Sequence, residues 1–145
     1  MTTHSSAPWW SQAVFYQVYP RSFRDSNCDG VGDLDGVTAK LGYLRLLGVD
    51  AIWLNPVMVS PMADHGYDVA DPRDVDPLFG GMAALDRLIE AAHDVDIKVT
   101  MDLVPNHTSS RHPWFQAALA SSPGSEQRER YIFRDGTGRG GMHPP

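Results

Sequence analysis

Three short apolar runs mark the chain, each bounded by proline or glycine signals. They cover residues 14–19, 51–54 and 97–104. All three are rich in β-branched or aromatic side chains, and short runs of this composition are typical of buried β-strands. The pattern therefore predicts three strands that lie far apart along the chain.

Two helical patterns lie between these predicted strands. In the first, Val37, Leu41 and Leu44 follow helical spacing, and Gly48 stands where a C-terminal cap belongs. The alternation of strands and helices predicts an α/β fold with a parallel sheet. The second helical pattern is an i, i+3, i+4, i+7 stripe of Leu85, Leu88, Ile89 and Ala92.

The pattern changes after residue 104. Residues 113–121 predict a short helix with Pro113 in its first turn, and residues 131–133 predict a short strand. Residues 136–145 are rich in glycine, end in two prolines and offer nothing to pack. The third predicted strand therefore has no clear helix after it, and the alternation stops there.

Composition narrows the class of protein. A chain of 145 residues that is 42% hydrophobic is one ordinary domain or a piece of a larger one, and its single cysteine excludes an internal disulfide. The formal net charge of −6 argues against a nucleic-acid or anionic-membrane partner. No run approaches the ~18 apolar residues of a membrane span, and residues 1–8 lack the apolar core of a secretory leader. We therefore expect a cytoplasmic protein.

A loop at residues 25–33 has the oxygen pattern of a cation site. Side-chain oxygens occupy its positions 1, 3, 5 and 9, a backbone carbonyl is offered at position 7, and glycine occupies position 6. Gly36 at position 12 and the absence of a preceding helical pattern argue against an EF-hand. A free-standing structural Ca²⁺ or Mg²⁺ loop is favoured, and the alternative is a turn in which Asp and Asn side chains bond their own backbone. The candidate ligands are Asp25, Asn27, Asp29, Val31 through its carbonyl, and Asp33.

Polar side chains follow the second and third predicted strands. Asp64, His65 and Tyr67 come after the second, and Asp102 and His107 lie at or beyond the end of the third. In parallel α/β folds, ligands meet the loops at the carboxyl ends of strands. A carboxylate, an imidazole and a phenol there can bond sugar hydroxyls. Spacing alone also allows an ordinary polar loop and a structural histidine.

Taken together and in order, these segments resemble the α-amylase superfamily, glycoside hydrolase family 13. The likeness is greatest to its bacterial α-glucosidase and oligo-1,6-glucosidase branch, and it runs from about residue 9 to residue 133. The segments that carry it are residues 10–23, 25–33, 48–54, 60–69 and 102–109.

The resemblance implies a (β/α)₈ TIM barrel, of which this chain would supply the first three strands and two helices. Residues 1–108 would be the N-terminal part of that barrel, and residues 109–145 the truncated start of a domain inserted after the third strand. It also implies retaining hydrolysis of an α-linked gluco-oligosaccharide or disaccharide. The nucleophile, the acid/base and a third acid are expected after later strands, so the chain alone is expected to be inactive. The alternative is a non-catalytic cation- or sugar-binding module.

The resemblance assigns roles residue by residue. Asp64 and Tyr67 match residues that line the pocket for the non-reducing-end glucose, and His107 matches a histidine that bonds the same sugar. Asp102 and Asn106 match residues that support the site. The loop of residues 25–33 matches a Ca²⁺ or Mg²⁺ loop typical of this branch.

Departures from the family pattern are few. Asn55 takes a place often held by serine, and Cys28 stands where glycine is expected. Only three of the 18 acidic residues are glutamates, and they lie on the polar face of a predicted helix or in a polar loop. None of the three fits the role of a catalytic acid/base.

Overall fold

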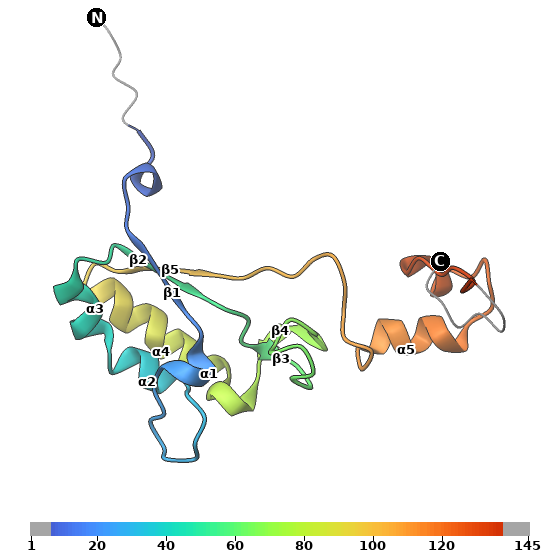
Figure 1. Cartoon of the computed structure of the whole chain (residues 1–145), viewed down its shortest axis with the longest axis horizontal. Helices are drawn as coiled ribbons and strands as arrows, with labels where there is room; N and C mark the ends of the chain where they lie inside the picture. The colour runs from blue at the N-terminus through green and yellow to red at the C-terminus, as the bar shows by residue number, and fades with distance from the viewer. Residues whose placement is uncertain (1–6, 138–145) are drawn as a thin grey trace, which may run out of the picture.

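A computed structural model of the chain describes residues 7–137 (Figure 1). Most of the polar N-terminal stretch of residues 1–8, predicted to carry no leader, and most of the Gly-rich segment 136–145 lie outside the described residues. In chain order the elements are η1 (Trp9–Ser11), β1 (Phe15–Val18), α1 (Pro20–Phe23), α2 (Leu34–Thr38), α3 (Leu41–Leu47), β2 (Ala51–Leu54), β3 (Met58–Val59), β4 (Asp71–Val75), η2 (Pro77–Phe79), α4 (Gly81–Asp94), β5 (Lys98–Met101), α5 (Pro113–Ala120) and η3 (Arg128–Arg130).

The predicted parallel sheet is confirmed. Its strands lie in the order β1-β2-β5, and both neighbouring pairs are parallel. The third strand is shorter than predicted, because β5 ends at Met101 and leaves Asp102 as the first residue beyond it. Since the three strands run the same way, their carboxyl ends lie at one edge of the sheet, and we call this edge the carboxyl edge.

Helices gather on one side of this sheet, below it in Figure 1. Val18, Ile52 and Leu54 of the strands are fully buried in one cluster with side chains of α2, α3 and α4. Burial of one such side chain stabilises the fold by about 1.5–3 kcal/mol. The cluster comprises Val18, Leu34, Val37, Leu41, Leu44, Val49, Ile52, Leu54, Val57, Val75, Phe79, Ala84, Leu85, Leu88, Ala92 and Ile97.

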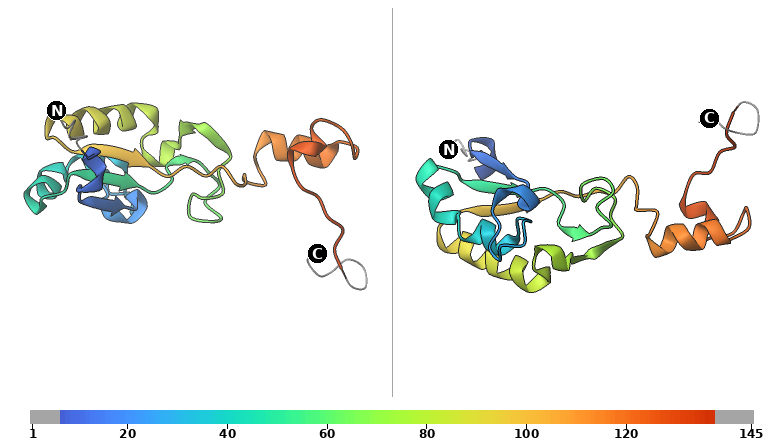
Figure 2. Two further views of the ribbon diagram at one scale, coloured as in Figure 1. Left: turned by 90° about the horizontal axis from the view of Figure 1, so that it is seen from above. Right: turned by 60° about the horizontal axis from the view of Figure 1, so that its bottom comes forward.

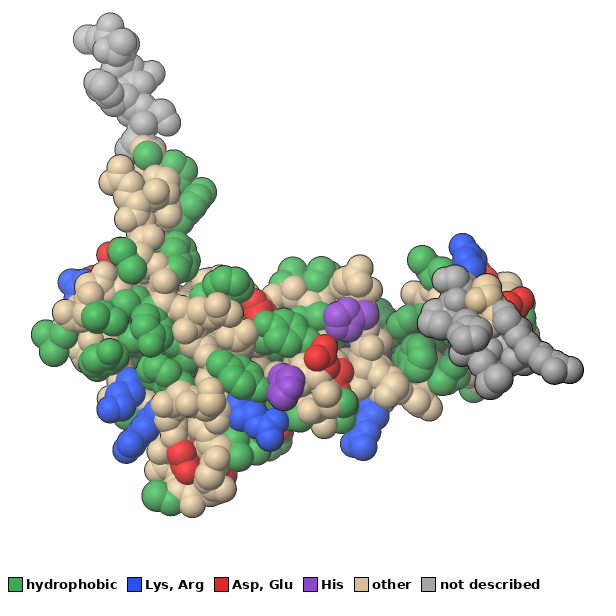
Figure 3. Space-filling model, in the orientation of Figure 1, with side chains coloured by type: hydrophobic (Ala, Val, Ile, Leu, Met, Phe, Trp, Pro, Cys, Tyr) green, Lys and Arg blue, Asp and Glu red, His purple; other side chains and the backbone are tan. Residues whose placement is uncertain are grey.

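The opposite face of the sheet is open to solvent. Because side chains alternate along a strand, Phe15 and Trp53 point away from the helices, and they are 43% and 39% exposed. Hydrophobic side chains are also exposed where η1 extends from the sheet (Figure 3). A parallel sheet covered by helices on one face has the geometry of one wall of a TIM barrel, whose interior would be this open face.

The first helical pattern forms two helices rather than one. α2 ends at Thr38, whose hydroxyl donates to the carbonyl of Leu34 over 2.9 Å, and α3 begins at Leu41. Such back-bonding competes with the helix ladder. Gly48 is confirmed as the C-terminal cap of α3, in the left-handed conformation at φ 86°.

A hairpin that the sequence did not predict positions the loop after β2. Strands β3 and β4 pair antiparallel and enclose residues 60–70, which include Asp64 and Tyr67. Asp76, just after β4, accepts hydrogen bonds from the backbone N–H groups of Ser60 and Leu78. A strand as short as β3 leaves too few positions to show an alternating pattern.

The elements after β5 form a small lobe of α5 and η3 that stands apart from the sheet (Figure 2). The predicted helix is confirmed, and the His112 side chain caps it by accepting from the N–H of Trp114. The predicted strand at residues 131–133 is wrong, because these residues form no strand and pair with none of the strands of residues 7–137. Tyr131 instead packs its ring against Phe115, at 5.2 Å between centroids, and its hydroxyl lies 2.8 Å from that of Thr108.

Two further expectations concern the chain as a whole. Among residues 7–137, no helix is both long enough and apolar enough to cross a lipid bilayer. The boundary between residues 1–108 and 109–145 stays a prediction.

Close packing at Gly36 holds the two ends of the 25–33 loop together. The backbone N–H of Asp33 donates to the carbonyl of Arg24 over 3.1 Å, and a Cβ on Gly36 would overlap that carbonyl. We expect Gly36→Ala to lower the free energy of unfolding by about 2 kcal/mol, because the contact is with backbone that cannot move aside.

Gly42 provides the matched control, because a Cβ there meets nothing within 4 Å. It lies in α3, so Gly42→Ala should raise stability by about 0.5–1 kcal/mol. Urea unfolding of both variants measures the two effects. Equal stabilities for the two variants would contradict the packing described at Gly36.

Candidate sugar-binding site at the carboxyl edge

Asp102 is the centre of the hydrogen bonding at the carboxyl edge. Its Oδ1 accepts from the indole Nε1–H of Trp53 over 2.6 Å, and its Oδ2 accepts from the Tyr67 hydroxyl over 2.7 Å. Its backbone N–H donates to the carbonyl of Leu54, which continues the ladder between β5 and β2. Both carboxylate oxygens are therefore engaged, and the side chain is fixed between two aromatic residues.

The bonding continues across the sheet from Tyr67. The Tyr67 hydroxyl accepts from Nδ2 of Asn55 over 2.8 Å, and Oδ1 of Asn55 accepts from Nε2 of Gln17 over 3.2 Å. Gln17 lies on β1, Asn55 follows β2 directly and Asp102 follows β5. We call the five residues Gln17, Trp53, Asn55, Tyr67 and Asp102 the edge network.

The environment of Tyr67 favours its neutral form. The hydrogen bond to the Asp102 carboxylate, together with partial burial, raises the pKa of Tyr67 above its ordinary value of 10.0, and the donor from Asn55 offsets part of this effect. The phenol therefore keeps its proton throughout the physiological range. Its single proton is used in the hydrogen bond to Asp102, and its apolar ring face suits contact with a sugar.

His107 lies beside the same loop. Its Nε2 lies 3.1 Å from the backbone carbonyl oxygen of Tyr67. A carbonyl can only accept, so Nε2 carries the proton and Nδ1 is the nitrogen left to meet a ligand. His107 thus tethers the Tyr67 backbone while the edge network holds the Tyr67 hydroxyl.

Asp64 is exposed at the tip of the loop, and Asp68 shapes the backbone beneath it. Oδ1 of Asp68 accepts from the N–H of Asp64 and from the hydroxyl of Ser60. Partial burial alone would raise the pKa of Asp68, but these bonds and one from the N–H of Ala63 outweigh it and lower the pKa. The loop also holds Met62 and His65 at positive φ, so these bonds fix a backbone that most residues avoid.

The structure brings together most of the residues predicted from the sequence at this edge. Tyr67 bonds Asp102 through its hydroxyl and His107 through its backbone carbonyl, and Asp64 lies in the same loop as Tyr67. Asn106 is exposed and makes no side-chain hydrogen bond within the described residues. Its supporting role stays a prediction, as do the sugar-binding roles of the other residues.

Sequence reasoning missed Trp53 and Asn55 as members of the site. The signal was available in part: Ile52 and Leu54 face the helices, so the residue between them must face the opposite side. Asn55 is the first residue past a buried strand, which is a position from which side chains reach the carboxyl edge. Their partners could not be identified, because those bonds join residues 12 to 49 positions apart.

The 25–33 loop lies in a separate part of the structure and is ordered by its own side chains. Asp25 accepts from the N–H groups of Asn27, Cys28 and Gly30, and Asp29 accepts from that of Val31. The bond from Gly30 is the largest of the effects that lower the pKa of Asp25. Stability that depends on this ionised carboxylate is present above pH 3.8 and is lost as the pH falls through the lowered value.

Asp33 joins the start of this loop to α2. Its Oδ1 caps α2 by accepting from the N–H of Gly36, and its Oδ2 accepts from the hydroxyl and the N–H of Ser26. Burial alone would raise the pKa of Asp33, but these bonds lower it. The oxygen donors suit a hard cation, although no three Asp, Glu, His or Cys side chains among residues 7–137 converge in a metal-binding group.

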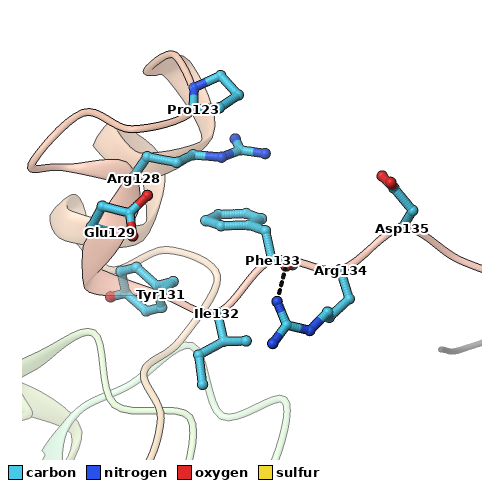
Figure 4. A pocket seen from close by; sticks show the side chains of 8 residues that line it. All are labelled: Pro123, Arg128, Glu129, Tyr131, Ile132, Phe133, Arg134 and Asp135. Atoms are coloured by element: carbon cyan, nitrogen blue, oxygen red, sulfur yellow. Dashed lines mark hydrogen bonds between the residues drawn. The ribbon is translucent and has the colours of Figure 1, made fainter.

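A hollow of about 580 Å³ lies in the lobe rather than at the carboxyl edge (Figure 4). The guanidinium of Arg128 lies 3.6 Å from the ring centre of Phe133, and the same side chain donates to the carbonyl of Ala118. None of the residues predicted to bind sugar or metal lines this hollow, which is formed by Pro123, Arg128, Glu129, Tyr131, Ile132, Phe133, Arg134 and Asp135.

Several curated proteins resemble the chain over nearly all of its length. An alpha-glucosidase of Pediococcus pentosaceus is 52% identical over 90% of the chain. A glucan 1,6-alpha-glucosidase of Streptococcus pneumoniae is 55% identical over 88%, and a palatinase of Erwinia rhapontici is 53% identical over 97%. The chain spans about a quarter of the length of these relatives, 23%, 24% and 25% respectively.

Solved structures agree with these relatives. A mutant of the trehalulose synthase MutB in complex with the substrate sucrose superposes with a TM-score of 0.88 at 47% identity, covering 96% of this chain and 24% of MutB. A trehalose-6-phosphate hydrolase of Bacillus licheniformis gives 0.85 at 46% identity, over 90% of this chain and 23% of its own.

The family assignment rests on a match over most of the chain. The family model of the alpha-amylase catalytic domain matches residues 17–145, which include the whole sheet except the first two residues of β1. The parallel strands with helices on one face agree with an incomplete barrel of that family. The chain therefore belongs to the alpha-amylase catalytic-domain family of glycoside hydrolases.

Proposed function

We propose that the chain is part of a retaining α-glucosidase and that its carboxyl edge forms one side of the pocket for the terminal glucose. The observation that carries this proposal is the edge network, which joins all three parallel strands to the loop of Tyr67. The relatives named alpha-glucosidase and glucan 1,6-alpha-glucosidase support the substrate class.

The residues at this edge bind and orient rather than cleave. Asp64 offers an exposed carboxylate as a hydrogen-bond acceptor, and His107 offers Nδ1. Tyr67 presents an aromatic ring, and carbohydrate rings stack on such faces through their C–H groups. Asp102 holds Tyr67 in place, and each of its two oxygens accepts a hydrogen bond from an aromatic side chain.

Retaining hydrolysis needs two carboxyl groups about 5 Å apart, one as nucleophile and one as acid/base. Among the described residues, the glutamates lie on α4 or in the lobe, and Glu126 pairs with Arg130. These side chains cannot serve the carboxyl edge. The cleaving pair of the proposed enzyme is therefore not supplied by residues 7–137.

The 145-residue chain should consequently show no hydrolysis of p-nitrophenyl α-glucoside above the buffer rate. Release of nitrophenol measures this directly. Turnover that is abolished by Asp64→Ala would overturn the assignment of a binding role, because a binding carboxylate cannot catalyse without the missing pair.

Binding of glucose should survive without cleavage. We expect methyl α-glucoside to shift the indole N–H resonance of Trp53 in a ¹H–¹⁵N spectrum, with a dissociation constant on the order of millimolar for so small a contact area. Asp64→Ala should weaken this binding about tenfold, because it removes a charged hydrogen-bond acceptor.

Asp94 gives the matched control for that experiment. It is an exposed aspartate at the end of α4, next to the amino end of β5 and therefore at the opposite edge of the sheet. Asp94→Ala should leave binding unchanged. No shift of the Trp53 resonance with any amount of sugar, or equal loss in both variants, would contradict the sugar pocket.

We also propose that the 25–33 loop binds one structural Ca²⁺ or Mg²⁺ ion. The ligands would be the oxygens of Asp25, Asn27, Asp29 and Asp33 with the carbonyl of Val31. A bound divalent ion would neutralise these carboxylates and fix the loop. The support is the alternation of oxygen donors and their ordering by loop N–H groups.

Divalent cation should therefore stabilise the chain against heat. At a concentration one hundred times the dissociation constant, binding adds about 2.7 kcal/mol, which raises the Tm by about 5–10 °C for a chain of this size. Scanning calorimetry with CaCl₂, MgCl₂ or EDTA measures the effect. Asp29→Ala should abolish it and Asp94→Ala should not, and identical Tm values with cation and with EDTA would refute the site.

A further inference from the structure

We propose that Asn55 is a positioning residue: its NH₂ group fills the acceptor side of the Tyr67 hydroxyl and so keeps the hydroxyl proton on Asp102, which leaves Tyr67 only its ring face for a ligand. The sequence singled out Asn55 merely as a residue at a place often held by serine. Its two amide atoms contact different partners, on two other segments of the site.

The direction of the hydrogen bonds follows from one fixed point. An ionised carboxylate can only accept, so the Tyr67 hydroxyl must donate its single proton to Oδ2 of Asp102, 2.7 Å away. The phenol oxygen can then only accept from its other neighbour. That neighbour is Asn55, which therefore presents its NH₂ group at 2.8 Å.

Gln17 completes the same chain of bonds. With its NH₂ group committed to Tyr67, Asn55 presents its carbonyl Oδ1 to β1, where Nε2 of Gln17 donates over 3.2 Å. Each amide can act as donor at one end and acceptor at the other. The bonds therefore run in one direction, from Gln17 through Asn55 and Tyr67 to Asp102.

Trp53 donates the second side-chain hydrogen bond to Asp102. Its indole N–H, which is a donor only, fills Oδ1 of Asp102 over 2.6 Å. Asp102 thus receives one neutral donor on each oxygen, and no cationic side chain contacts it among the described residues. Hydrogen bonds to a charged acceptor are stronger than those between neutral groups, so a change in the bond from Tyr67 to Asp102 should change the bond from Trp53 to the same carboxylate.

One consequence for recognition rests on the proposed function. Because the only proton of the Tyr67 hydroxyl is committed to Asp102, this hydroxyl cannot donate to a sugar oxygen. Hydroxyl-specific contacts then fall to Asp64 and to Nδ1 of His107, while the ring of Tyr67 supplies stacking. A tyrosine hydroxyl that was not held by such hydrogen bonds could rotate and donate its proton to the ligand.

The indole N–H of Trp53 is a reporter that needs no sugar. Its ¹H–¹⁵N resonance, assigned by its loss in Trp53→Phe, responds to the electron density on Asp102. Tyr67→Phe removes the donor to Oδ2, and the shift of the Trp53 resonance in this variant is the reference with which the other variants are compared. We expect Asn55→Asp to produce at least half of that shift, because a near-isosteric carboxylate competes with Asp102 for the Tyr67 proton.

A second variant separates the loss of the Asn55 hydrogen-bond donor from the negative charge that Asn55→Asp adds. Asn55→Leu removes the donor without adding charge and should move the resonance in the same direction as Asn55→Asp. Gln12→Glu likewise converts an amide into a carboxylate, at an exposed side chain before β1 with no hydrogen-bond partner among residues 7–137, and should leave the resonance in place.

Each result decides the proposal. It is overturned if Tyr67→Phe shifts the resonance while Asn55→Asp and Asn55→Leu, both folded by circular dichroism, do not, because Asn55 would then only pack. A response to Gln12→Glu as large as that to Asn55→Asp would also overturn it. Failure of the chain to bind methyl α-glucoside would contradict the sugar pocket and leave this proposal standing, so the two failures are distinguishable.

Discussion

The parallel pairing of β1, β2 and β5 is the constraint on which the candidate site depends. It places the carboxyl ends of three strands at one edge, although paired residues lie 36 positions apart between β1 and β2 (Phe15 and Ala51) and 47 apart between β2 and β5 (Ala51 and Lys98). Gln17, Asn55 and Asp102 meet there only because Val18 pairs with Leu54 and Leu54 with Met101. A slip of one residue in either pair would turn every side chain to the other face and separate them.

The register itself is held by burial on the helical face. Val18, Ile52 and Leu54 are completely buried against α2, α3 and α4, so their alternation fixes which residues face the open side. Trp53 is placed toward Asp102 by the same alternation. The alternation of side chains along the strands thus places apolar residues in the core and the polar residues of the site on the face opposite the helices.

The sequence was enough to predict the strands, the parallel sheet and the positions of Asp64, Tyr67, Asp102 and His107 beyond the strand ends, because these follow from local apolar periodicity. It could not supply the β3–β4 hairpin or the break between α2 and α3, which depend on tertiary contacts and one threonine back-bond. It also wrongly predicted a strand at residues 131–133, where an apolar run packs through aromatic contact instead. The partners in the edge network are non-local, so no local pattern reveals them.

Hydrogen exchange of the Trp53 indole is the most direct test that the carboxyl edge is built as described. Its side chain is 39% exposed, so without a partner the N–H would exchange about as fast as that of Trp10, which is 59% exposed. The bond to Asp102 predicts that the N–H of Trp53 exchanges at least tenfold more slowly, since 1.4 kcal/mol of protection is a factor of ten, and that Asp102→Ala, which removes the acceptor, removes most of this protection. Equal exchange rates for Trp53 and Trp10 in the unaltered chain would contradict the account.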